Sequence, residues 1–119
     1  MYKIFFYEDK NGNSPVYEYI QGLSKRTDKD GRINFNKIND YIEVLSEYGK
    51  TAGTPYMKHL DSEIWELRPI RARLFFSSWI DDSFIILHFF QFKKTQKTPK
   101  REIEQAKQNL KDAIERSRA

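Results

Sequence analysis

Residues 85–101 have the sequence IILHFFQFKKTQKTPKR, in which a continuous apolar run leads directly into five cationic residues with no acid among them. The apolar part is rich in branched and aromatic side chains and predicts a buried strand over 84–92. Thr98-Pro99 predicts the start of a helix, because proline is well tolerated in the first helical turn. The stretch therefore predicts a strand that delivers cations to one rim of a small sheet, a place suited to holding phosphates.

The elements around this stretch follow from hydrophobic periodicity. Helical spacing predicts two helices, from Val16 to Leu23 and from Phe35 to Leu45, which we expect to pair as an antiparallel hairpin. Gly49 is well placed to end the second helix, and Ile103 begins the apolar stripe of a third. Further strands are predicted at 2–7, 56–60, 63–67 and 72–79. The expected fold is α+β, with a compact antiparallel β-sheet, an N-terminal helical hairpin and a C-terminal helix.

Composition limits the classes of function. The chain has 119 residues, which suits a single domain over 1–119, and a net charge of +4, which favours a polyanionic partner without proving one. It contains no cysteine, so disulfides, thiolate nucleophiles and cysteine-type zinc sites are excluded. The longest apolar run, Phe84 to Phe90, is too short to cross a bilayer, and charge interrupts the N-terminal segment too early for a signal peptide. We therefore expect a soluble cytoplasmic protein with no membrane partner.

Two strand segments carry arginines that can converge. Side chains alternate between the faces of a strand, so Glu66 and Arg68 share one face, and Arg71 and Arg73 share a face of the next strand. If the two strands pair around Pro69, Arg68 and Arg73 lie close together. Like charges at that range repel by about 1 kcal/mol or more at partial burial, so an anion between them would explain the cluster. Each arginine taken alone more often points into solvent, but for the set we favour a binding role.

The first turn of the predicted C-terminal helix is also basic. Lys100 and Arg101 lie where the helix dipole disfavours cations, and such a turn can bind a phosphate through its exposed backbone N–H groups. The alternative is that Glu102 and Glu104 compensate the two cations, so that the helix merely tolerates them. This alternative is about as good as the phosphate site.

The histidines do not indicate a metal. His59 and His88 have no metal-ligand spacing to a partner, so we expect no metal and no other cofactor. His88 lies in an apolar strand, where a single histidine is more often a hydrogen-bonded core residue than a catalyst, although its pKa range suits proton transfer. His59 is interpreted as a surface residue. Glu66 beside Arg68 is more often half of an ion pair than a general base.

Three segments in order carry a resemblance to a known family. They are IWELRP at 64–69, RARLFF at 71–76 and LHFFQFKKTQKTP at 87–99, followed by an amphipathic helix. This combination resembles the RelE/ParE toxin superfamily, and within it the phage-derived HigB-like branch. The resemblance implies a RelE-like sheet flanked by helices and a toxin of a type II toxin–antitoxin pair. It further implies cleavage of ribosome-bound mRNA without a metal, and a small antitoxin partner with a helix-turn-helix domain.

The resemblance also assigns roles to residues. It implies that Arg73 contacts the scissile phosphate, that Arg68 assists it, and that Lys93 and Lys94 form the basic pair after the final strand. Some RelE-type enzymes use a tyrosine near the C-terminus, but no tyrosine follows Tyr56 here, so the general base is unassigned. The proton-transfer candidates are His88, Glu66 and one lysine of the pair. Four further cations are expected to bind flanking RNA phosphates: Arg71, Lys97, Lys100 and Arg101.

The sequence leaves two alternatives to a nuclease function. A ParE-like inhibitor of DNA gyrase would share the fold without being a nuclease. A non-catalytic RNA-binding or ribosome-binding module would bind in a salt-sensitive way without cleavage. The basic C-terminal half favours the nuclease, because gyrase inhibition does not obviously need Arg68, Arg73 and the lysine pair together.

Overall fold

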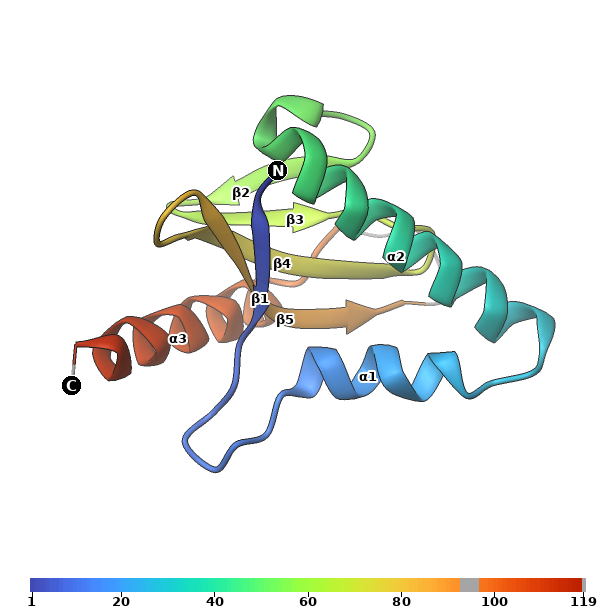
Figure 1. Cartoon of the computed structure of the whole chain (residues 1–119), viewed down its shortest axis with the longest axis horizontal. Helices are drawn as coiled ribbons and strands as arrows, with labels where there is room; N and C mark the ends of the chain where they lie inside the picture. The colour runs from blue at the N-terminus through green and yellow to red at the C-terminus, as the bar shows by residue number, and fades with distance from the viewer. Residues whose placement is uncertain (93–96, 119) are drawn as a thin grey trace.

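Apolar strand patterns and amphipathic helix patterns account for most of the chain, and the computed structural model describes residues 1–92 and 97–118 (Figure 1). The strands are β1 (Lys3–Phe6), β2 (Met57–Asp61), β3 (Ile64–Leu67), β4 (Ala72–Trp79) and β5 (Ser83–Gln91). The helices are α1 (Pro15–Ser24), α2 (Lys29–Tyr48) and α3 (Lys100–Ser117), with a short 3-10 helix, Gly49–Ala52, after α2. In these described ranges no helix combines the length and apolar character needed to cross a membrane.

The five strands form one mixed sheet in the order β1-β5-β4-β3-β2. From β2 to β5 the sheet is an antiparallel meander, as predicted. β1 instead lies parallel to β5, with Lys3 opposite Ser83, so the prediction of a wholly antiparallel sheet is wrong for this strand. A parallel pair needs a long crossover connection, and here that connection contains α1, α2 and the other three strands. The apolar pattern of a four-residue strand does not reveal its direction.

The second helix is longer than its apolar stripe. It begins at Lys29, where Asp28 caps it by accepting a hydrogen bond from the backbone N–H of Gly31 at 3.2 Å. The sequence predicts a polar break between the helices over 25–31, and the first three residues of α2, Lys29 to Gly31, fall within it. Gly49 ends α2 as predicted, with a φ of +60° that glycine adopts without strain.

The sheet is covered on both faces. The α1 and α2 side packs Val16, Ile38 and Leu45 against Leu74 and Phe76, all of which are buried. The α3 side forms a separate cluster on the opposite face of the strands: Ile64, Phe75, Ile85, Leu87, Ala106, Leu110 and Ala113. In Figure 1 the two N-terminal helices and α3 accordingly lie on different sides of the sheet.

A bulge in β5 changes which residues face α3. Phe76 pairs with Ile86, whereas the preceding Phe75 pairs with His88, so Leu87 is an extra residue in β5. Ile85 and Leu87 both face α3, and strict alternation would turn His88 to the other face. Because of the bulge, His88 also points to the α3 side, where it meets Glu102.

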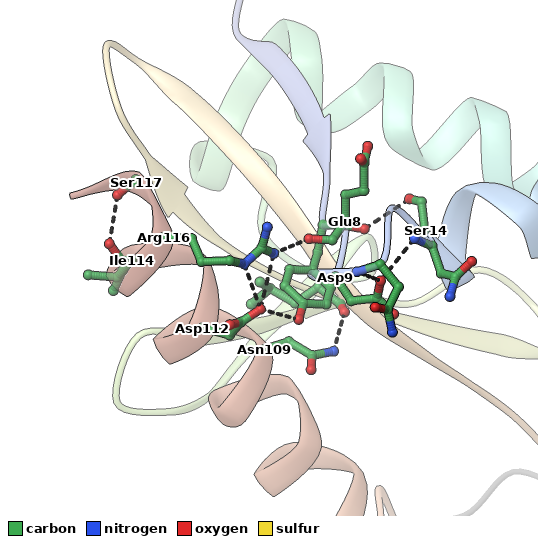
Figure 2. Close-up of polar contacts among 12 residues, drawn as sticks. Glu8, Asp9, Ser14, Asn109, Asp112, Ile114, Arg116 and Ser117 are labelled. Atoms are coloured by element: carbon green, nitrogen blue, oxygen red, sulfur yellow. Dashed lines mark hydrogen bonds and ion pairs between the residues drawn. The ribbon is translucent and has the colours of Figure 1, made fainter. Parts of the chain in front are cut away.

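Polar contacts fix the far end of α3 to the rest of the molecule (Figure 2). The Tyr7 hydroxyl donates to Asp112 Oδ2 at 2.6 Å, and Arg116 Nε donates to the same oxygen at 3.1 Å. Arg116 also donates to the carbonyl of Glu8, and Asn109 Nδ2 donates to the carbonyl of Leu87 at 2.8 Å. Burial and the neighbouring Asp112 raise the pKa of Tyr7, so its hydroxyl stays protonated as a donor. These bonds join α3 to β5 and to the residues just after β1.

The Tyr7 contact gives a stability prediction. The Tyr7→Phe variant removes one hydrogen bond to a charged group, so the free energy of unfolding should fall by about 1.5 kcal/mol. Urea unfolding measures this change. Tyr17→Phe is the matched control, because the Tyr17 side chain is 49% exposed. Equal unfolding midpoints for the two variants would show that the Tyr7 bond does not stabilise α3.

Candidate active site

The two arginines that the strand pattern predicts to converge lie on either side of one carboxylate. Arg68 Nε is 3.7 Å from Glu66 Oε1, and Arg73 Nε is 3.9 Å from the same oxygen. The pairing of β3 with β4 produces this arrangement, because Leu67 lies opposite Leu74 and thereby brings the next residues of both strands together. The anion expected between the arginines is therefore the protein's own Glu66, which forms an ion pair with Arg68 as the sequence suggested.

Arg73 is held from several directions. Its Nη1 donates to the carbonyls of Pro69 at 3.1 Å and Ala72 at 3.0 Å, and its guanidinium lies 4.5 Å from the centre of the Phe92 ring. Burial lowers the pKa of Arg73, the charge of Glu66 opposes this, and the charge of Arg68 lowers it further. Only 8% of the Arg73 side chain is exposed, against 32% for Arg68. Arg68 is thus the member of the pair that a ligand reaches directly.

A cleft of about 210 Å³ opens beside this cluster. Glu66 is 2% exposed at this cleft, and its Oε2 accepts a hydrogen bond from Thr98 Oγ1 at 2.8 Å. Thr98 precedes α3, so this bond fixes the entry to the helix against the sheet. Eight residues line the cleft: Lys58, His59, Leu60, Glu66, Arg68, Lys97, Thr98 and Ile103. The cleft combines three cations, one histidine and one carboxylate, which suits a phosphate-containing ligand.

His59 has a defined tautomer in its neutral form. Its Nε2 lies 2.7 Å from the carbonyl oxygen of Ser62. A carbonyl oxygen can only accept, so Nε2 carries the hydrogen and Nδ1 is left with a free lone pair. The ring also packs at 5.1 Å against Trp65, its direct partner across β2 and β3. The ring of His59 therefore lies on the Trp65 face of the strands, opposite to Lys58 and Glu66.

His88 lies against α3. Its Nε2 is 2.7 Å from Glu102 Oε1, and its ring stacks on Phe75 at 5.7 Å. Glu102 Oε2 also accepts from Arg101 Nε at 3.2 Å. This arrangement agrees with a hydrogen-bonded histidine at the edge of the core, and it shows that Glu102 does compensate Arg101 in the first turn of α3. In the described part of the chain, Lys100 is exposed at the first position of the same turn.

A second depression lies at the other side of the arginine cluster and is here called the α2 pocket. Its volume is about 430 Å³, and it is lined by Arg26, Asp30, Asn34, Arg71, Gln91 and Phe92. Phe92 connects the two sites, because it lines the α2 pocket and its ring carries the Arg73 guanidinium. Arg71, expected to bind RNA, belongs to this pocket and is exposed.

The sequence-predicted site residues lie at the cleft, at the start of α3 and, for Arg71, in the α2 pocket. Glu66, Arg68, Arg73 and Lys97 come together around the cleft, whereas His88 and Arg101 meet at the start of α3. Lys93 and Lys94 lie outside the described residues. The structure adds Lys58, His59 and Thr98, which sequence reasoning missed. Lys58 could have been found from the strand register, because it lies directly opposite Glu66 in β2. Within the described ranges, no group of three or more His, Cys, Asp or Glu residues could hold a metal ion.

Comparison with models of protein families gives a match. The family model described as "Phage derived protein Gp49-like (DUF891)" matches residues 18–111. The matched range begins in α1, ends in α3 and contains every residue that lines the cleft. A search of curated proteins finds no match to the chain.

The buried carboxylate leads to a double-mutant prediction. Glu66→Gln keeps the side-chain shape but leaves Arg73 as a buried cation without its partner, so the free energy of unfolding should fall by about 3 kcal/mol. Arg73→Met removes that cation, and the double variant should lose less stability than the two single variants added together. The measurement is urea unfolding of all four proteins. Strict additivity would mean that the two side chains are not coupled.

The start of α3 gives a prediction about pH. Burial raises the pKa of Glu102, but hydrogen bonds and charges from His88 and Arg101 outweigh this and hold its pKa below the ordinary value of 4.5. A lowered pKa in the folded state means that this group's contribution to stability is complete above the unfolded-state pKa. The contribution is lost as the pH falls through the folded-state pKa. In His88→Gln, the Glu102 pKa measured by NMR should rise, whereas His59→Gln should leave it unchanged. An unchanged value in His88→Gln would contradict this account.

Proposed function

This chain belongs to the phage-derived Gp49-like family, a RelE-like family associated with toxin–antitoxin systems, and on that basis we propose that it is a toxin that cleaves ribosome-bound mRNA. The observation that carries the proposal is the cleft in which the partly exposed Arg68 and two lysines lie beside a carboxylate that is held between Arg68 and Arg73. Such a site suits a phosphodiester, because its cations are preorganised by contacts within the protein. No metal ion has a part in the proposed reaction.

The exposure of each side chain decides its proposed role. Arg68 reaches into the cleft and is placed to bind the scissile phosphate, while Lys58 and Lys97 bind neighbouring phosphates. Arg73 is too buried to be the first contact and adds positive charge from beneath the cleft. Glu66 positions both guanidinium groups. In this scheme Lys93 and Lys94, next to Lys97 in sequence, are further candidates for phosphate binding.

The proposed reaction uses the substrate's own 2′-hydroxyl. Its oxygen forms a bond to the adjacent phosphorus, the bond from phosphorus to the 5′-oxygen breaks, and a 2′,3′-cyclic phosphate and a 5′-hydroxyl result. The 2′-hydroxyl loses its proton to a base, and the 5′-oxygen gains one from an acid. The base is left unassigned, because the ring of His59 packs on Trp65, on the face of the sheet opposite to Glu66. His88 is engaged by Glu102 on the α3 side.

The surface and the family imply two kinds of partner. A net charge of +4 and the exposed side chains of Arg71, Lys97, Lys100 and Arg101 favour approach to ribosomal RNA. A toxin of this kind is inactivated by a cognate antitoxin, here proposed to be a small protein with a helix-turn-helix domain. An antitoxin that covers the cleft, or that prevents entry to the ribosome, would serve equally well.

Brief expression of the chain in a bacterial host, followed by primer extension on abundant mRNAs, tests the proposal. New 5′ ends inside reading frames, present only while translation proceeds, are expected. Growth arrest with intact mRNA would contradict the proposal and favour a gyrase inhibitor of the ParE type. Ribosome binding without cleavage or arrest would favour a non-catalytic module.

The Arg68→Ala variant tests the site itself. Loss of one preorganised group that stabilises the transition state should lower the cleavage rate about 10²- to 10³-fold. Arg68→Lys should recover only part of this loss, since lysine lacks the planar fork that matches a phosphate. Arg32→Ala, at an exposed arginine on α2, is the matched control and should cleave at the parental rate. Parental cleavage by Arg68→Ala would place the reaction elsewhere.

A further inference from the structure

The α2 pocket has the size and the lining of a ligand site that the proposed cleavage reaction does not use. Its volume of about 430 Å³ falls within the range of about 300–1,000 Å³ that is typical of small-molecule sites. It also has a planar aromatic side chain, Phe92, next to three uncharged or acidic polar groups on Asp30, Asn34 and Gln91. A flat ring beside hydrogen-bonding groups is the combination that proteins use to hold an unpaired nucleobase.

One polar group of the pocket, the amide of Gln91, is held in place before any ligand binds. Gln91 Nε2 donates to the Tyr19 hydroxyl at 2.8 Å, and the Tyr19 ring stacks on Phe89 at 4.2 Å with an interplanar angle of 7°. This contact uses the amide nitrogen of Gln91 and leaves its oxygen as an acceptor. Asp30 lies in the first turn of α2, which Asp28 caps, and it offers two more acceptor oxygens. The amide oxygen of Gln91 and the carboxylate of Asp30 are thus acceptors on this side of the pocket.

A carboxylate is unexpected in a pocket built for phosphates alone. Both cations that line the pocket are exposed, and Arg26 is tied to Asp28 by bonds of 2.8 and 2.6 Å. Asp30 would repel a phosphate but would accept hydrogen bonds from an amino group. Cytosine, adenine and guanine carry an exocyclic amino group, and uracil does not. Arg71 can meanwhile bind the phosphate attached to the same nucleotide.

The position of the pocket relative to the cleft supports a shared ligand. The backbone N–H of Phe92 donates to the carbonyl of Arg71 at 3.3 Å, so β4 and β5 hold these two residues together at their ends. Phe92 also supports Arg73, which belongs to the arginine cluster beside the cleft. A single RNA strand can therefore reach both sites by passing over the ends of β4 and β5.

We propose that the α2 pocket binds one base of the RNA strand and selects a base with an exocyclic amino group over uracil. Phe92 provides the stacking surface, Asp30 and Gln91 accept from the amino group, and Arg71 binds the adjoining phosphate. The inference rests on the proposed function for its biological meaning, because the base would belong to the cleaved mRNA. The binding event itself can be measured without cleavage.

An NMR titration of the purified chain with 5′-CMP and with 5′-UMP tests the pocket. The two nucleotides have the same ring size and charge and differ on the hydrogen-bonding edge of the base. CMP should cause saturable shifts of the backbone amides of Asp30, Asn34 and Gln91, and it should bind about tenfold more tightly than UMP. Equal affinities, or CMP shifts confined to the cleft around Arg68, would overturn the inference.

A pair of matched variants tests whether the Asp30 carboxylate selects the base. Asp30→Asn keeps the shape of the side chain, replaces one acceptor oxygen by a donor, and should abolish the preference for CMP over UMP. Asp40→Asn changes an exposed acid of the same helix outside the pocket and should keep the full preference. If Asp30→Asn retains the parental preference, the carboxylate does not select the base.

Cleavage maps separate this inference from the proposed function. If the parent cleaves mRNA, Asp30→Asn should cleave with a relaxed preference at one position near the cut. Identical maps, together with no nucleotide shifts in the pocket, would overturn the inference and leave the nuclease intact. Selective CMP binding by a chain that cleaves no RNA would support the pocket and reject the nuclease.

Discussion

The buried carboxylate of Glu66 is the constraint on which the rest of the site depends. A charge that is 2% exposed is tolerated only where opposite charges and hydrogen bonds surround it, and here these come from three separate segments. Arg68 follows β3, Arg73 lies in β4, and Thr98 precedes α3. One side chain therefore fixes the strand pair, orients both guanidinium groups and sets where the C-terminal helix begins. Arg68 and Arg73 stay beside Glu66 because burying the Glu66 charge without partners would cost several kcal/mol.

Much of the fold could be predicted because its elements have strong local patterns. The apolar run of β5 and the stripes of α1 and α3 each contain enough residues to reveal the type of element. The parallel placement of β1 could not be predicted, because strand direction depends on the path of the whole chain. The bulge at Leu87 could not be predicted either, because one extra residue does not change the pattern of a uniformly apolar run. That single residue decides that His88 faces α3.

The site was predictable only in part, for a related reason. Alternation along β3 and β4 places Glu66, Arg68 and Arg73 on compatible faces, and the register then brings them together. Thr98 meets Glu66 across 32 positions of sequence, and such a contact depends on how the connection to α3 returns to the sheet. His59 looks like an ordinary surface residue in sequence, and only the carbonyl of Ser62 gives it a defined tautomer. Side chains placed by strands were predictable, and those placed by connections were not.

The parallel pairing of β1 with β5 has a consequence for the order in which the protein is made. Lys3 of β1 pairs with Ser83, which is synthesised 80 positions later. At about 5–20 residues per second, the early strand waits roughly 4–16 s for its neighbour. The loop that closes between them is long, so this step is intrinsically slow compared with formation of the β4–β5 hairpin. The nascent chain therefore cannot complete its sheet until β5 has emerged, and β1 remains an unpaired strand for most of synthesis.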